Sequence, residues 1–259
     1  MYPVLFRLGQ FEITSFGVLV ALATLIAWQV FSREVRIAGI PGNAPDLALY
    51  AIFGGFAGAK LLWAIEHLHE QPFLDLMFSR GGLSWFGGFI GGVGTGVVLV
   101  VRSRLPLMAT LSAATPALAI GHLIGRIGCF LVGDDYGRPS SLPWALAFPR
   151  GLPPVFEPVH PTQLYEAAWL AGVVWLLIRW RRRGVANTDV LGRYLVAAAG
   201  FRFLLEFIRV NPKIALGMTM AQWMSAGVVL TGLAILALSW GVGRRHHPCS
   251  LLSASAVDS

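Results

Sequence analysis

The sequence has few charged residues for its length. Asp, Glu, Lys and Arg make up 13% of its 259 residues, whereas 56% of the residues are hydrophobic. A typical soluble domain has roughly 25% charged residues. The mean hydropathy of +0.66 points in the same direction. The composition therefore excludes an ordinary water-soluble domain and predicts a polytopic membrane protein.

The sequence also lacks a disulfide framework, the pattern of a signal peptide and a clear internal repeat. Its two cysteines, Cys129 in an apolar segment and Cys249 near the C-terminus, do not make a disulfide framework. The first residues have neither the basic start nor the small-residue cleavage site of a signal peptide, so we expect the first apolar segment to be retained. The glycine-rich segments 54–58 and 87–92 match each other only weakly, which argues against a transporter built from related halves.

Seven apolar segments are long enough to cross a membrane, since about 20 residues span about 30 Å of hydrocarbon. The sequence therefore predicts an all-α bundle of seven transmembrane helices. Residues 1–240 would form a single domain, and residues 241–259 a disordered cytoplasmic tail. The seven segments are Thr14–Phe31, Asp46–Glu66, Leu83–Val101, Leu107–Val132, Gln163–Trp180, Val190–Arg209 and Met218–Trp240.

Basic residues in the connections predict the orientation of this bundle, because cytoplasmic loops carry an excess of Lys and Arg. Eleven arginines follow the odd-numbered segments, whereas six basic residues lie on the opposite side. We therefore predict an outer N-terminus, a cytoplasmic C-terminus and an outer-face loop at 133–160. The net charge of +7 is mostly this cytoplasmic excess, so nucleic-acid binding is not expected.

The candidate site centres on residues 121–149, where an apolar helix breaks into a polar loop. Arg126 lies inside the apolar segment. A charged side chain costs roughly 2.5 to 3.5 kcal/mol near the bilayer centre, so an intramembrane arginine is by default a functional hypothesis. The loop carries Asp134, Asp135 and Arg138, and its two acids could orient the two arginines or be solvated. A membrane-level cation beside such a loop suits a lipid headgroup.

Further charged residues lie in other apolar segments. Arg202, Glu206 and Arg209 are spaced i, i+4 and i+7, so they would form one stripe of a helix. Glu166 needs a partner inside the membrane, and an arginine is the obvious choice. Lys60 either snorkels to the interface or lines a headgroup cavity. We expect more buried positive charge from these arginines than the acidic residues neutralise, which favours a phosphate site.

The residues alone leave open an enzyme acting on a phospholipid, an organic-anion transporter and a lipid-binding structural protein. Several motifs favour the enzyme. GRIGCFLVGDDYGRP at 125–139, LPWALAFP at 142–149 and HPTQLYE at 160–166 resemble the signature of the bacterial prolipoprotein diacylglyceryl transferases. RFLLEFIR at 202–209 and MAQ at 220–222 resemble that family's later motifs. The likeness extends from Phe16 to Gln222.

The resemblance implies a membrane enzyme. The family transfers the diacylglyceryl group of phosphatidylglycerol to the lipobox cysteine thiol of a prolipoprotein, which forms a thioether and releases glycerol phosphate. This is the first step of lipoprotein maturation, in the bacterial cytoplasmic (inner) membrane. The expected partners are phosphatidylglycerol and lipobox peptides, and no metal or organic cofactor is implied. The alternatives are a diverged phosphatidylglycerol-binding paralogue with another acceptor, or none, and an organic-anion transporter.

The resemblance also suggests roles for particular residues. Arg126 and Arg202 would stabilise the departing phosphate. The favoured base for the incoming thiol is Glu206, followed by His160 and His122. The predicted substrate-binding residues, besides Arg126, are Lys60, Asp134, Gly137, Tyr165, Glu166 and Arg209.

Three positions depart from the family pattern. Phe16 replaces the usual Tyr, Phe86 replaces a His or Tyr, and Cys129 replaces the usual Asn. Each change removes a polar group from the expected pocket. Phe86 matters most, because it leaves the identity of the base open.

Overall fold

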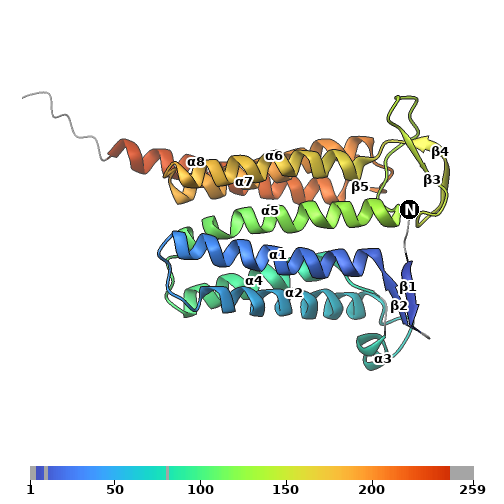
Figure 1. Cartoon of the computed structure of the whole chain (residues 1–259), viewed down its shortest axis with the longest axis horizontal. Coiled ribbons are helices and arrows are strands. Elements are labelled where there is room, and N and C mark those ends of the chain that lie inside the picture. Colours follow the sequence, from blue (N-terminus) through green and yellow to red (C-terminus); the bar gives the residue numbers. More distant parts are fainter. Residues whose placement is uncertain (1–3, 9–10, 80–81, 246–259) are drawn as a thin grey trace, which may run out of the picture. The chain divides into compact units, whose positions relative to one another are not determined.

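The computed structural model describes residues 4–8, 11–79 and 82–245, which are mostly helical. The chain divides into two compact units. Residues 24–117 form the first, called here the middle unit. Residues up to 23 and from 118 onwards form the second, called here the terminal unit. Each is described by itself, and Figure 1 labels the elements of both.

Glycines shape the main helix contact of the middle unit, between α2 (Ala44–Glu66) and α4 (Trp85–Arg102). A Cβ on Gly91 would lie 2.4 Å from the carbonyl oxygen of Gly54 and 3.0 Å from the Cα of Gly58. A side chain does not fit at this distance. The two backbones therefore pack directly against each other, as small residues spaced four apart allow in lipid.

The middle unit has a small apolar core beside this contact. It includes the C-terminal part of α1 (Ser15–Ile37) and the N-terminal part of α5 (Leu107–Val132). Phe31, Val35 and Ala113 are buried in this core. The short helix α3 (Phe73–Phe78) follows α2 in the chain.

The terminal unit contains the remainder of α5 and the C-terminal helices. These are α6 (Thr162–Arg182), α7 (Asn187–Leu205), the 3-10 helix η1 (Glu206–Ile208) and α8 (Met220–Arg245). Helices α7 and α8 pack closely, since a Cβ on Gly192 would lie 3.0 Å from the carbonyl oxygen of Gly232. Leu177 of α6 and Val190 of α7 are fully buried in the unit's apolar core.

Three antiparallel hairpins complete the terminal unit. They pair β1 (Val4–Leu8) with β2 (Phe11–Thr14), β3 (Leu146–Phe148) with β4 (Val155–Val159), and β5 (Lys213–Ala215) with β6 (Met218–Thr219). The β3–β4 hairpin belongs to the loop between α5 and α6 and lies beyond the C-terminal end of α5 (Figure 1). The loop predicted at 133–160 is therefore partly ordered by strand pairing.

Each of the seven predicted segments coincides with most of a long helix. Four regions are long and apolar enough to cross a membrane, namely α1, α2, α5 and Met220–Trp240 of α8. The described chain is thus a largely helical membrane protein with four candidate spans, and crossing by all seven helices stays a prediction.

Some predicted boundaries are corrected by the structure. The three hairpins were not predicted, so the all-α description holds for the long elements only. Helix α7 ends at Leu205, whereas the prediction extended the helix to Arg209. Residues 241–245 continue α8 and do not begin a disordered tail. The remainder of the predicted tail, 246–259, lies outside the described residues.

The glycine contact of the middle unit can be tested by substitution. We expect Gly91→Ala to lower the free energy of unfolding by about 1 to 3 kcal/mol, because the added methyl group overpacks the contact between α2 and α4. Thermal unfolding of the purified protein in detergent would measure the change. Gly94→Ala is the matched control, since a Cβ at Gly94 in the same helix meets no atom within 4 Å. Equal effects of the two substitutions would contradict the packing argument.

Candidate active site

Three arginines and three carboxylates form one ion-pair network in the terminal unit. Arg126 comes from α5, Arg202 from α7, and Arg209 follows η1. The carboxylates are Asp135 in the loop after α5, Glu166 in α6 and Glu206 in η1. The network therefore brings together most of the charged side chains that the sequence marked as a candidate site.

Glu166 is the carboxylate that joins the helices of this network. Its Oε2 atom lies 2.8 Å from Nε of Arg126 and 3.9 Å from Nη1 of Arg202. Its Oε1 atom lies 3.2 Å from Nε2 of His122, one turn before Arg126 in α5. The Glu166 side chain is only 3% exposed. The predicted arginine partner of Glu166 is therefore present, and a second arginine and a histidine share the same carboxylate.

Glu206 connects Arg202 with the third arginine, Arg209. Its Oε2 atom lies 3.1 Å from Nη2 of Arg202 and 3.6 Å from Nε of Arg209. Its Oε1 atom accepts hydrogen bonds from Thr219 Oγ1 at 2.9 Å and Asn211 Nδ2 at 2.5 Å. The side chain is completely buried. Although α7 ends before Glu206, this residue still contacts both arginines of the predicted helical stripe.

Asp135 joins Arg126 with Arg209 from the loop side. Its Oδ2 atom lies 2.8 Å from Nη1 of Arg126, and its Oδ1 atom pairs with Nη2 of Arg209. Burial alone would raise the pKa of Asp135, but the charges of Arg209 and Arg126 hold this pKa below its usual value. Asp135 is therefore a carboxylate at neutral pH.

Backbone hydrogen bonds fix the loop that carries Asp135. Gly137 N donates to the carbonyl oxygen of His160 at 2.9 Å, and Arg138 N donates to that of Ile208 at 2.8 Å. A Cβ at Gly137 would lie 2.7 Å from the Ile208 oxygen, so glycine permits this close approach. Thr162 Oγ1 donates to the backbone oxygen of Asp135 at 2.6 Å. These contacts hold Asp135 beside the segment that ends in Arg209.

The ion-pair network is balanced in charge. Its three guanidinium groups face three carboxylates, so the expectation of more buried positive charge than the acids need is wrong for these residues. Two buried guanidinium nitrogens nevertheless make no hydrogen bond within the described part of the chain, although each lies within ion-pair distance of a carboxylate. They are Nη1 of Arg202 and Nε of Arg209.

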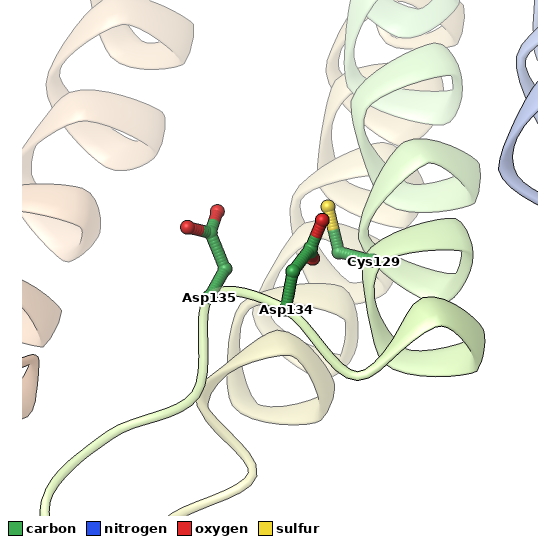
Figure 2. A group of neighbouring side chains, drawn as sticks. All are labelled: Cys129, Asp134 and Asp135. Atoms are coloured by element: carbon green, nitrogen blue, oxygen red, sulfur yellow. The ribbon is translucent and has the colours of Figure 1, made fainter. Parts of the chain in front are cut away.

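Cys129, Asp134 and Asp135 form a small cluster at the end of α5. Figure 2 shows the Asp134 carboxylate beside the Cys129 thiol. One ligand atom from each residue lies within 4.8 Å of the others. However, Nη1 of Arg126 is 4.0 Å from the sulfur and 2.8 Å from Asp135. A guanidinium at this distance repels a metal cation, so the cluster does not make a convincing metal site.

The structure assigns different contacts to the two acidic loop residues. Asp135 pairs with Arg126, whereas Asp134 accepts a hydrogen bond from Gln163 through its backbone oxygen. The pKa of Asp134 is raised by burial and by the neighbouring charge of Asp135. Arg138 joins this part of the site through its backbone. Within the described residues, Asp135 is thus the acid of the two that forms ion pairs with arginines.

His160 and Tyr165 lie together at the start of α6. His160 Nδ1 is 3.2 Å from the Tyr165 hydroxyl, and Trp144 Nε1 donates to the same hydroxyl at 2.8 Å. The described contacts of Tyr165 connect α6 with the loop between α5 and α6. The predicted substrate-binding role of Tyr165 stays a prediction.

Lys60 belongs to the middle unit. Its ammonium group donates to the backbone oxygen and the hydroxyl of Ser79, at 3.0 and 2.9 Å, and lies 4.5 Å from the Trp63 ring centroid. Phe86 belongs to the same unit. The substrate-binding role of Lys60 stays a prediction.

Several polar residues of the site were not singled out from the sequence. Asn211 and Thr219 bind Glu206, Gln222 accepts a hydrogen bond from Thr219 N, and Gln163 and Thr162 bind the loop backbone. Four of them lie inside or beside the motifs HPTQLYE and MAQ. A search for neutral polar residues inside or beside these motifs would therefore have found four of these site residues.

Comparison with known proteins agrees with the motifs. Residues 3–238 match the family described as "Prolipoprotein diacylglyceryl transferase". The chain belongs to this family. A phosphatidylglycerol–prolipoprotein diacylglyceryl transferase of Chromohalobacter salexigens is 32% identical, over 95% of this chain and 93% of the relative. A protein of the same name from Methylococcus capsulatus is 32% identical, over 92% and 95%. One from Rhizobium meliloti is 30% identical, over 93% and 91%.

The range of residues that matches the family includes the whole site. The matched range includes every residue of the ion-pair network and the loop that carries Asp135. One of the three residues that depart from the family pattern, Phe16, lies against α5. A Cβ on Gly128 of α5 would be 3.2 Å from the Phe16 ring.

The central position of Glu166 gives a stability prediction. We expect Glu166→Gln to lower the free energy of unfolding by about 3 kcal/mol, because Arg126 loses its buried carboxylate and Arg202 keeps only Glu206. Thermal unfolding in detergent would measure the effect. Glu70→Gln removes the carboxylate of an exposed His69–Glu70 pair and should change stability by less than about 1 kcal/mol. A Glu166→Gln variant as stable as this control would refute the central role of Glu166.

Proposed function

We propose that this chain transfers the diacylglyceryl group of phosphatidylglycerol to the lipobox cysteine thiol of a prolipoprotein. The observation that carries the proposal is the cluster of three arginines, contributed by two helices and the segment after η1, in a chain of the prolipoprotein diacylglyceryl transferase family. The family name supplies the reaction, and the cluster supplies a place for the anionic part of the lipid.

The reaction is a displacement at carbon. The cysteine sulfur attacks the glyceryl carbon bonded to the phosphate oxygen, so a C–S bond forms while the C–O bond breaks. The electron pair of that bond leaves with the oxygen, which gives glycerol phosphate, and the thiol proton goes to a base. The site must therefore stabilise negative charge on the leaving phosphate and favour the thiolate.

Arginines suit the first requirement. A guanidinium presents a planar set of donors that matches two phosphate oxygens, and its charge does not depend on pH in the working range. Arg126 and Arg202 are held in place by the buried carboxylate of Glu166. Donors fixed before the reaction need no reorganisation as charge develops. We therefore assign phosphate stabilisation to these two residues together with Arg209, which shares the Asp135 carboxylate with Arg126.

The second requirement concerns the base. Glu206 is fully buried, and both of its oxygens are engaged, by Arg202, Thr219 and Asn211. It would have to leave these partners to accept a proton. His160 is only partly buried, and its Nδ1 contacts only a tyrosine hydroxyl among the contacts described above. We therefore place His160 before Glu206 as base and treat Glu206 as the residue that positions Arg202.

The membrane arrangement is part of the proposal. We infer seven transmembrane helices in the bacterial cytoplasmic membrane, with the N-terminus and the loop at 133–160 on the outer face. The four apolar candidate spans and the excess of arginine in alternate connections support this arrangement. Lipid would then reach the arginines from the membrane, and the lipobox peptide would reach them from the outer side.

The Arg126 guanidinium gives the first test of the function. Purified protein in phosphatidylglycerol vesicles should add one diacylglyceryl group to a lipobox peptide, measured by mass, and none to the same peptide with serine in place of cysteine. We expect Arg126→Ala to lower the rate at least about 100-fold, the usual cost of removing a preorganised donor. Exposed Arg150 provides the control Arg150→Ala, which should retain the rate.

Three results would oppose this assignment. Transfer by a folded Arg126→Ala variant at the normal rate would remove Arg126 from the phosphate site. No transfer by the native protein, with phosphatidylglycerol still bound, would favour a diverged paralogue. Movement of an organic anion across the vesicle membrane without transfer would favour a transporter.

The base can be tested through the pH dependence of transfer. We expect His160→Gln to slow transfer near pH 7 and to recover toward the native rate above about pH 8.5, where a free thiol ionises without help. The measurement is the transfer rate of both proteins from pH 6 to 9.5. A deficit that is constant over this range would assign His160 a positioning role. Glu206→Gln, tested in parallel, would show the pH-dependent deficit only if Glu206 is the base.

A further inference from the structure

The three carboxylates of the ion-pair network differ in their access to solvent. The side chains of Glu206 and Glu166 are 0% and 3% exposed, whereas that of Asp135 is 40% exposed. Glu166 and Glu206 are therefore held inside the unit by several partners each. Asp135 lies at the edge of the network, in a loop, where rotation about its own side-chain bonds moves its carboxylate toward solvent.

The contacts of Asp135 resemble those of a bound phosphate. One carboxylate oxygen pairs with Arg126 and the other with Arg209, so the carboxylate bridges two guanidinium groups. Two non-bridging oxygens of a phosphodiester can make the same pair of contacts. The two anions also carry the same charge of about −1 when ionised.

Charge balance favours exchange of one anion for the other. The network has three guanidiniums and three carboxylates. If a phosphodiester bound while all three carboxylates kept their positions, four anions would face three cations in a largely buried site, which is costly. If the phosphodiester replaces Asp135, the charge count does not change. The low pKa of Asp135 means that its carboxylate stays ionised, so another anion must replace it at the arginines.

We propose that Asp135 is an exchangeable counter-ion that occupies the phosphate position between Arg126 and Arg209 until the lipid headgroup displaces it. This inference rests on the function proposed above and adds a residue that competes with the substrate. Asp135 then sets the affinity of the site for phosphate. It also favours release of the product, because its carboxylate can return as glycerol phosphate leaves.

The proposal predicts that removing the carboxylate tightens anion binding. Asp135 has φ of 62°, a conformation that asparagine tolerates well, so Asp135→Asn removes the charge and suits the backbone. We expect the dissociation constant for glycerol phosphate, measured by calorimetry on the purified protein in detergent, to fall about tenfold. This is the expected factor if Asp135 occupies the position about nine-tenths of the time. The KM for phosphatidylglycerol should fall in parallel, without a rise in kcat.

Two matched variants control this measurement. Glu157→Gln removes an exposed carboxylate from β4 in the same outer loop and should leave binding and transfer unchanged. Asp135→Ser removes the carboxylate with a shorter side chain and replaces the asparagine variant if that variant does not fold. Failure of both Asp135 variants to fold would overturn the proposal, because a carboxylate required for folding is not a displaceable counter-ion.

The outcomes separate this inference from the proposed function. Weaker or unchanged glycerol phosphate binding by Asp135→Asn, with normal transfer by the native protein, would overturn the counter-ion role and leave the transferase intact. Tighter binding by Asp135→Asn, in a native protein that transfers no diacylglyceryl group, would support the anion exchange and overturn the function. Tighter binding together with a lower KM supports both.

Discussion

The site depends on the buried carboxylate of Glu166. Arg126 and His122 come from α5 and Arg202 from α7, and all three lie next to this one side chain of α6. Burying any of these charges alone would be costly, and an ion pair offsets that cost only with good geometry. The shared carboxylate therefore fixes three helices relative to one another within the terminal unit. It also fixes the direction in which the guanidinium groups point.

The sequence predicted the members of the site better than their pairing. Arg126 in an apolar segment, the spacing of Arg202, Glu206 and Arg209, and an arginine partner for Glu166 were all readable, because helical periodicity and the membrane environment constrain them strongly. The sequence did not indicate which of Asp134 and Asp135 pairs with the arginines. This pairing follows from the loop backbone, which is fixed by hydrogen bonds to distant segments, and such long-range contacts leave no local pattern.

The prediction of the helices from the sequence was limited in a related way. All seven predicted segments have a helical counterpart, but α6 and α7 do not reach the apolarity of a candidate span. Glu166 in α6 and Arg202 in α7 lower the hydropathy of these helices, so residues that build the site weaken the signal of the helices that carry it. The end of α7 at Leu205 was missed for a different reason. Glu206 and Arg209 face the network through a 3-10 turn and the extended residue after it, and spacing alone does not distinguish this arrangement from a continued helix.

The balanced charge of the network constrains how the site works. Three unpaired guanidiniums inside a membrane protein would be costly, and internal carboxylates remove that cost. The same carboxylates then compete with any anionic substrate for the arginines. A pair with a fully buried carboxylate, such as Arg202 and Glu206, cannot exchange partners without leaving a bare buried charge, whereas a pair at the edge of the network can exchange its anion with solvent or lipid. A membrane site for phosphate therefore needs both kinds of carboxylate: buried ones that hold the cations in place, and an accessible one that yields its position.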